Sequence, residues 1–131
     1  MEAWINKLYE TFIETEYYKL LLEGLGNTLI ITAGALVIGV VIGMLIALIK
    51  FFAEDVPSLR PLSFICDLYV TVIRGIPVVV LLLIFYYIIM VSAEGTAVGI
   101  ITFGINSGAY MAELIRGGIG AVDRGQMEAG R

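Results

Sequence analysis

Residues 106–131 read NSGAYMAELIRGGIGAVDRGQMEAGR, and this stretch decides the fold. It begins inside an apolar segment and places Asn106, Ser107, Tyr110 and Glu113 at the depth expected of a membrane. The apolar pattern ends at Arg116, where a Gly-rich polar tail begins. We therefore expect a membrane helix that passes its chain to a segment on the aqueous side.

The composition indicates that the whole chain lives in a bilayer. Of 131 residues, 60% are hydrophobic and 15% are charged, and the mean hydropathy is +0.96, which is far from a soluble globular composition. No charged residue occurs over 24–49, 75–93 or 95–112, and a spanning helix needs about 20 apolar residues. The sequence thus predicts an all-α membrane protein with a membrane region over 24–116 and three transmembrane helices, at about 27–49, 75–93 and 97–116.

Residues 1–23 are expected to form an amphipathic helix that lies in the extracytoplasmic membrane interface. Apolar side chains recur four residues apart, while Glu and Asn side chains occupy other faces. The apolar residues are Trp4, Ile5, Leu8, Tyr9, Phe12 and Ile13. A disordered N-terminus is the alternative.

Two of the predicted spans carry small residues at four-residue spacing. They are Ala35, Gly39, Gly43 and Ala47 in the first span, and Gly104, Gly108 and Ala112 in the third. Because lipid is as apolar as Leu, membrane helices associate through close backbone packing, which small residues on one face permit. We expect each of these faces to pack against another helix.

Residues 50–61 contain two prolines and four charges, which predicts a short connection with Pro61 in the first turn of the next helix. Gly75 and Pro77 then predict a break before the second span. Backbone groups freed within a membrane must be satisfied inside protein or at a cavity. Arg74, beside the break, is therefore a candidate functional residue, and a helix kink with a snorkelling Arg is the alternative.

The distribution of Lys and Arg predicts the orientation, because cytoplasmic segments carry more of them. One side of the predicted spans receives only Lys7 and Lys19. The other side receives six, which are Lys50, Arg60, Arg74, Arg116, Arg124 and Arg131. We therefore expect the N-terminus outside and the C-terminus in the cytoplasm.

The polar residues of the third predicted span form a candidate substrate path, since polar groups within a membrane are costly. On a helix, Asn106, Tyr110 and Glu113 share one face, and Ser107 lies about 100° away. As an alternative, Asn106 and Ser107 bond to a neighbouring helix, while Glu113 and Arg116 form a surface pair. The predicted path consists of Arg74, Asn106, Ser107, Tyr110 and Glu113.

The sequence shows no catalytic machinery of its own. It has no G-x-x-x-x-G-K-[ST] loop for phosphates, no His and a single Cys, Cys66, so metal, haem and nucleophilic chemistry lack their usual residues. The net charge of −4 opposes nucleic-acid binding, which needs a basic surface. We expect a protein that is not an enzyme and needs no cofactor, and any energy must come from a partner.

The chain resembles permeases of bacterial ABC importers for polar amino acids of the histidine, glutamine, glutamate and arginine type. The resemblance rests on IRGIP at 73–77, NSGAY at 106–110, and DRGQ at 123–126 leading to EAG at 128–130. The last element is similar to the family's E-A-A-x-x-x-G loop. Ile76 stands where the family has Thr, and Gly130 replaces the second Ala. The chain stops before the motif's own glycine and two further spans, so we expect a truncation within the loop.

The resemblance implies the N-terminal part of a type I importer permease in the bacterial cytoplasmic (inner) membrane. Residues 117–131 would begin the cytoplasmic coupling loop, which docks on a separate ATP-binding cassette ATPase subunit. The residues assigned to coupling are Arg124, Gly125, Glu128, Ala129 and Gly130. A second permease subunit, identical or different, would complete the solute path, and an extracytoplasmic binding protein would deliver the solute.

Two other interpretations remain open at this point. The chain could be a membrane fragment that does not transport. It could also be a small membrane subunit or channel that forms oligomers through its glycine faces.

Overall fold

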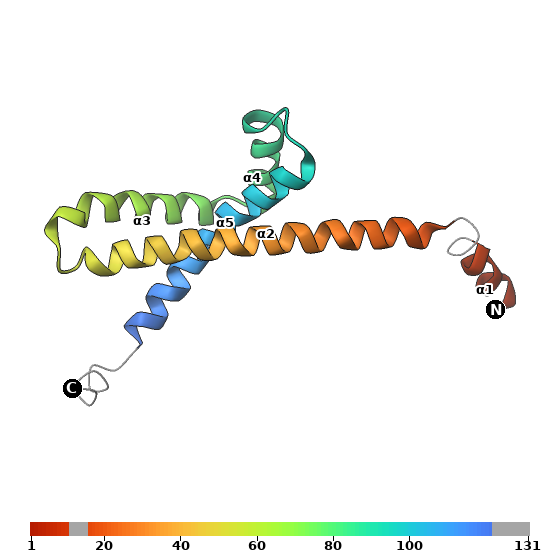
Figure 1. Ribbon diagram of the computed structural model, residues 1–131, viewed down its shortest axis with the longest axis horizontal. Coiled ribbons are helices and arrows are strands. Elements are labelled where there is room, and N and C mark those ends of the chain that lie inside the picture. Colours follow the sequence, from red (N-terminus) through yellow and green to blue (C-terminus); the bar gives the residue numbers. More distant parts are fainter. Residues whose placement is uncertain (11–15, 122–131) are drawn as a thin grey trace.

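The computed structural model describes residues 1–10 and 16–121, and its regular elements there are all helical (Figure 1). They are α1 (Glu2–Tyr9), α2 (Tyr17–Phe52), the 3-10 helix η2 (Pro57–Leu59), α3 (Arg60–Gly75), α4 (Val78–Ile84), the π-helix η3 (Phe85–Ile89) and α5 (Gly95–Gly120). The predicted all-α class is confirmed.

Two helices, α2 and α5, are long and apolar enough to cross a membrane. The segments Pro57–Gly75 and Val78–Ile89 pass the same test together, as a pair bent by 104°. Among the described residues there are thus two candidate spans, or three when the bent pair counts as one crossing.

Helix α2 is longer than the span expected at 27–49. It has 36 residues and begins at Tyr17, so residues 17–23 continue the long helix instead of belonging to an N-terminal amphipathic one. At about 1.5 Å per residue it is roughly 54 Å long, well beyond an apolar core of about 30 Å. Of the expected N-terminal helix, the structure contains α1, and residues 11–15 lie outside the described part.

The expected break at Gly75 and Pro77 is present. Helix α3 ends at Gly75, Ile76 and Pro77 have extended backbones, and α4 begins at Val78. Proline cannot donate a backbone hydrogen bond, which favours a helix start at this point. Even as an α-helix, Val78–Ile89 would rise only about 18 Å, so the crossing expected at 75–93 needs part of α3 as well.

Helix α5 runs four residues past the predicted exit at Arg116. The expectation of a loop over residues 117–120 is wrong, because these residues are helical and the Ala121 amide donates to the Gly117 and Gly118 carbonyls. Low glycine propensity costs about 1 kcal/mol per residue. Propagation of an existing helix, which adds one hydrogen bond per residue, can outweigh that cost.

The two small-residue faces are buried against each other, which confirms their predicted role in helix packing. Side chains fill the gaps from the opposite helix. Met111 lies over Gly43, Ile38 over Gly104 and Ile42 over Gly108. Because these contacts advance in the same direction along both helices, α2 and α5 run parallel.

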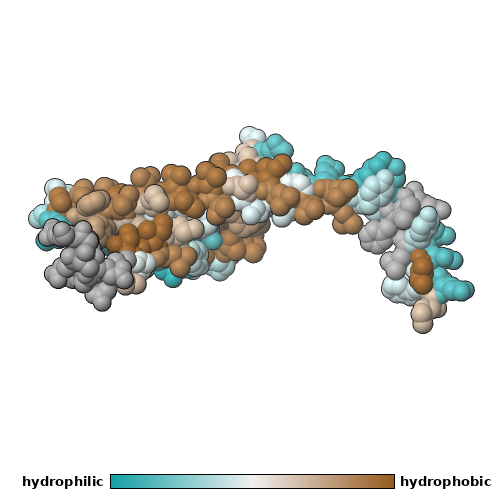
Figure 2. Space-filling model, turned by 60° about the horizontal axis from the view of Figure 1, so that its bottom comes forward, coloured by the Kyte–Doolittle hydropathy of each residue, from teal (hydrophilic) through white to brown (hydrophobic). Residues whose placement is uncertain are grey.

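Helix α3 runs back along the C-terminal half of α2 (Figure 1). Ile46, Cys66, Val70 and Ala112 form a buried apolar cluster that joins α2, α3 and α5. The Tyr69 hydroxyl donates a hydrogen bond to the Ile105 carbonyl across α3 and α5. The face of the molecule drawn in Figure 2 is mostly apolar, as expected of a surface that meets lipid or further helices.

Candidate functional site

Charged side chains gather where α2, α3 and α5 meet. We call Lys50, Asp67, Arg74, Glu113 and Arg116 the charged cluster. All five line one pocket of about 380 Å³, together with two uncharged residues of α3. The apolar cluster of the same three helices lies next to it, with Ala112 adjacent in sequence to Glu113, so packing holds these charges in place.

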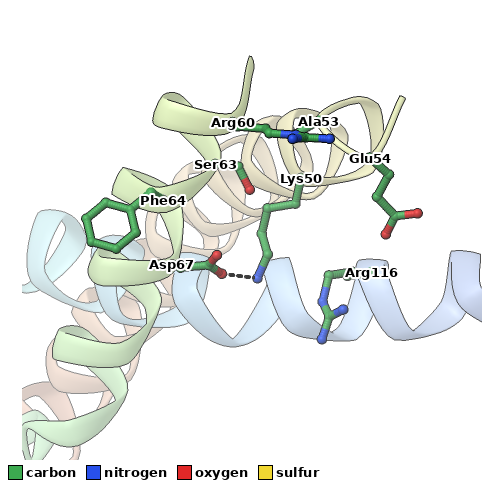
Figure 3. Close-up of a pocket in the computed structure, with 8 residues that line it drawn as sticks. All are labelled: Lys50, Ala53, Glu54, Arg60, Ser63, Phe64, Asp67 and Arg116. Carbon is green, nitrogen blue, oxygen red and sulfur yellow. Dashed lines mark ion pairs between the residues drawn. The ribbon is translucent and has the colours of Figure 1, made fainter. Parts of the chain in front are cut away.

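Lys50 stands at the centre of the charged cluster. It lies near the end of α2, and its side chain is only 12% exposed. Its Nζ is 2.6 Å from Asp67 Oδ1 and 3.0 Å from Glu113 Oε1. Figure 3 shows the Lys50 side chain reaching Asp67, with Arg116 of α5 beside it. A cation this far from water requires paired anions, and Lys50 has two.

Glu113 forms ion pairs with basic side chains of three helices. Its Oε1 lies 3.0 Å from Lys50 Nζ and 3.4 Å from Arg116 Nε, and its Oε2 lies 3.8 Å from Arg74 Nη1. The pair with Arg116 is the contact that the alternative interpretation of the sequence expected. The contact with Lys50 was not foreseen.

Arg74 and Tyr110 also meet. The guanidinium carbon of Arg74 is 5.1 Å from the centroid of the Tyr110 ring, within the range of a cation–π contact. The structure therefore brings together three residues of the predicted path, Arg74, Tyr110 and Glu113. Arg74 comes from α3, and Tyr110 and Glu113 come from α5. Of these three, the sequence alone placed only Tyr110 and Glu113 together, on one face of a single helix.

Asn106 and Ser107 lie in a different place, a mostly apolar groove between α2 and α5 of about 530 Å³. The groove is lined by Thr28, Ile31, Thr32, Ala35, Leu36, Phe103, Asn106 and Ser107. The Ser107 hydroxyl lies 3.2 Å from the Gly104 carbonyl and 3.5 Å from the Ala35 carbonyl. Ser107 thus bonds to a neighbouring helix, as its alternative interpretation expected.

A second pocket adjoins the charged cluster on the side of the turn between α2 and α3 (Figure 3). It shares Lys50, Asp67 and Arg116 and adds Ala53, Glu54, Arg60, Ser63 and Phe64. Within the described ranges, no group of three or more His, Cys, Asp or Glu side chains could hold a metal ion. The chemistry that this region offers is ion pairing between helices.

Three residues of the cluster, Lys50, Asp67 and Arg116, were not predicted as site residues, although the sequence did suggest that Arg116 pairs with Glu113. A signal was present, since Asp67 interrupts an apolar run and Lys50 ends another. The residues assigned to coupling, Arg124, Gly125, Glu128, Ala129 and Gly130, lie outside the described part of the chain.

Comparison with known proteins gives consistent matches. The family described as "Binding-protein-dependent transport system inner membrane component" matches residues 39–131. Over 113 residues the chain is 40% identical to a Rickettsia prowazekii (strain Madrid E) protein named as a glutamine transport system permease, GlnP, covering 83% of this chain and 50% of that protein. It is 35% identical to the arginine transport system permease protein ArtQ of Bacillus subtilis (strain 168), covering 83% of this chain and 49% of ArtQ.

One solved structure is also similar. It is the crystal structure of an amino acid ABC transporter with histidines, with a TM-score of 0.77 and 40% sequence identity. The match covers 88% of this chain and 53% of that one. The chain thus spans about half the length of the curated relatives and of the solved structure that it matches.

Proposed function

The chain belongs to the family of binding-protein-dependent transport system inner membrane components, and we propose that it acts as a transmembrane permease subunit of an ATP-driven importer for polar amino acids. The main support is the likeness to a solved amino acid ABC transporter over 88% of the chain. The packed bundle of α2, α3 and α5 is the frame of the proposed solute path.

The proposal requires three partners. ATP is hydrolysed on a separate ATP-binding cassette subunit, since the chain has no phosphate-binding loop. An extracytoplasmic binding protein delivers the solute, and a second permease subunit completes the path. In this assembly the N-terminus lies outside and the C-terminus in the cytoplasm, which agrees with the excess of Lys and Arg on one side.

The solute path is proposed to pass the groove at Asn106 and the Arg74–Tyr110–Glu113 contact. Arg74 and Glu113 carry the charges that an amino acid's carboxylate and ammonium groups would need. Tyr110 adds an aromatic face beside Arg74. Ser107 takes part mainly by holding α5 against α2.

Coupling to the ATPase is proposed to run through the end of α5. The helix continues without interruption from the packed region to Gly120. The segment that follows carries the motif-like residues Arg124, Gly125, Glu128, Ala129 and Gly130. A continuous helix transmits displacement as a rigid body, which is a common mode of alternating access.

Transport by a reconstituted complex tests the proposal. The permease, at whatever full length its gene encodes, is placed in proteoliposomes with the ATPase and binding protein encoded beside it. We expect ATP-dependent uptake of radiolabelled glutamine, arginine or histidine, and none when a non-hydrolysable ATP analogue is inside. A complex that assembles with all three partners but imports no polar amino acid contradicts the proposal.

Glu128→Lys tests the coupling segment within the same assay. Reversing this charge should leave ATP hydrolysis by the ATPase but reduce uptake, because the proposed docking contact is lost. Glu94→Lys, at the opposite end of α5, is the matched charge reversal and should leave uptake per ATP hydrolysed unchanged. Normal uptake with Glu128→Lys would remove this residue from the coupling contact.

A further inference from the structure

The charged cluster joins each pair among α2, α3 and α5 with an ion pair. Lys50–Asp67 joins α2 to α3, Lys50–Glu113 joins α2 to α5, and Arg74–Glu113 joins α3 to α5. We call these three contacts the triangle, with the three helices as its corners and one ion pair as each side. Lys50 takes part in two of its sides, and they are the two shorter ones.

The Lys50 side chain is more buried than the other charged side chains of the cluster. Its side chain is 12% exposed, against 55% for Asp67. Away from water, ion pairs are less screened and an unpaired charge is costly. Separating α2 from α3 or α5 would leave the Lys50 ammonium with fewer anions, so the charges oppose independent movement of the three helices.

Beyond this junction, α5 has little contact with the rest of the described chain. A Cβ added at Gly117, Gly118 or Gly120 would meet no atom within 4 Å. Displacement of the residues after Gly120 therefore reaches α2 and α3 through the packed part of α5, which includes the small-residue face, the apolar cluster and the charged cluster.

We propose that Lys50 is a positioning residue that makes α2, α3 and the middle of α5 one rigid unit, so that displacement of the segment after α5 moves all three helices together. This inference rests on the proposed coupling function for its effect on transport. Its structural part, the rigidity of the unit, is measurable without transport.

The variants are Lys50→Met, which keeps a flexible unbranched side chain but removes its charge, and Lys50→Arg, which restores a cation. Lys19→Met is the matched control, because Lys19 pairs with Glu16 in an exposed contact at the start of α2. Asp67→Asn removes only the α2–α3 side of the triangle at an exposed residue, and it keeps the inference testable if Lys50→Met does not fold.

Rigidity is read from spin labels on Glu54→Cys and Gly118→Cys in a Cys66→Ala background, with labelled permease chains diluted among unlabelled ones. We expect one narrow distance distribution, with and without ATP, in the unaltered permease–ATPase complex and with Lys19→Met. Lys50→Met should broaden the distribution or make it respond to ATP, Asp67→Asn should do so more weakly, and Lys50→Arg should restore it.

Coupling is read as ATP hydrolysed per amino acid imported. A coupling free energy of 1–3 kcal/mol corresponds to a change of roughly fivefold or more in an equilibrium between coupled states. Lys50→Met should therefore raise the ratio of ATP hydrolysed to amino acid imported by at least about fivefold. Lys50→Arg should return this ratio to that of the unaltered complex. A narrow, ATP-independent distribution in Lys50→Met overturns the inference, and the same result in Asp67→Asn overturns it if Lys50→Met does not fold. Absence of uptake by the unaltered complex instead contradicts the proposed function, while the distances still decide the rigidity.

Discussion

Asn106 and Ser107 are adjacent on α5 but have different surroundings. The Ser107 hydroxyl is within hydrogen-bonding distance of backbone carbonyls of α5 and α2. Asn106 lines the groove beside Thr28 and Thr32, whose hydroxyls donate to carbonyls within α2. Two neighbouring polar residues thus have distinct expected roles, one in helix packing and one facing the proposed path.

Replacing Asn106 should affect transport more than assembly. Asn106→Leu keeps a similar side-chain volume and removes the amide, so a hydrogen bond to the solute worth about 0.5–1.5 kcal/mol would be lost. We expect uptake to fall roughly 2- to 10-fold, with an unchanged yield of assembled complex by size-exclusion chromatography. Ser107→Ala is the control and should instead lower the thermal stability of the bundle.

Uptake by Asn106→Leu at the rate of the unaltered protein would show that Asn106 is only a packing residue. A loss of assembly with Asn106→Leu but not with Ser107→Ala would exchange the roles proposed for the two positions.

Lys50 illustrates which residue contacts could not be predicted from the sequence. Its place after an apolar run predicts only a charge at the end of a span. The separation from Glu113 is 63 residues, and nothing in helical periodicity relates residues so far apart. Glu113–Arg116 was predictable as a contact because three-residue spacing within one helix fixes it.

At the scale of elements, the small-residue faces were predictable but their partners were not. Four-residue spacing shows which face of each helix permits close approach. It does not show that the faces of α2 and α5 pack against each other, or that they do so in parallel. The extent of α2 was underestimated because residues 17–23 were assigned to a separate N-terminal helix, whereas the structure joins them to α2.

Gly43 tests the packing of α2 against α5. A Cβ at this position would lie 2.6 Å from Met111 Cβ and 3.0 Å from the Ala112 backbone nitrogen. Overpacking of this kind costs about 1–3 kcal/mol, whereas Gly→Ala within a helix otherwise gains about 0.5–1 kcal/mol. Gly43→Ala should therefore lower the free energy of unfolding in detergent.

Gly26→Ala is the matched control for this prediction. It lies in the same helix, and a Cβ there would meet no atom within 4 Å. Its unfolding midpoint in a denaturant titration should equal or exceed that of the unaltered protein. Equal stability of Gly43→Ala and Gly26→Ala would contradict the close approach of α2 and α5.

At the scale of the whole molecule, the parallel course of α2 and α5 constrains the path between them. Two parallel helices that both cross a bilayer leave it on the same side, so the chain must return once between them. The bent segment formed by η2, α3, α4 and η3 is the only stretch available for that return, which agrees with three crossings.

Labelling of single cysteines tests this arrangement. In a Cys66→Ala background, Glu54→Cys lies in the turn after α2, Gly118→Cys near the end of α5, and Ser92→Cys in the turn before α5. A membrane-impermeant maleimide should reach the first two in inverted vesicles and Ser92→Cys in spheroplasts, because the ends of parallel helices share a side and Lys and Arg favour the cytoplasm. The Cys66→Ala parent should remain unlabelled. Labelling of Glu54→Cys and Gly118→Cys from opposite sides would exclude parallel crossings, whereas labelling of both in spheroplasts would keep the three crossings and reverse the proposed orientation.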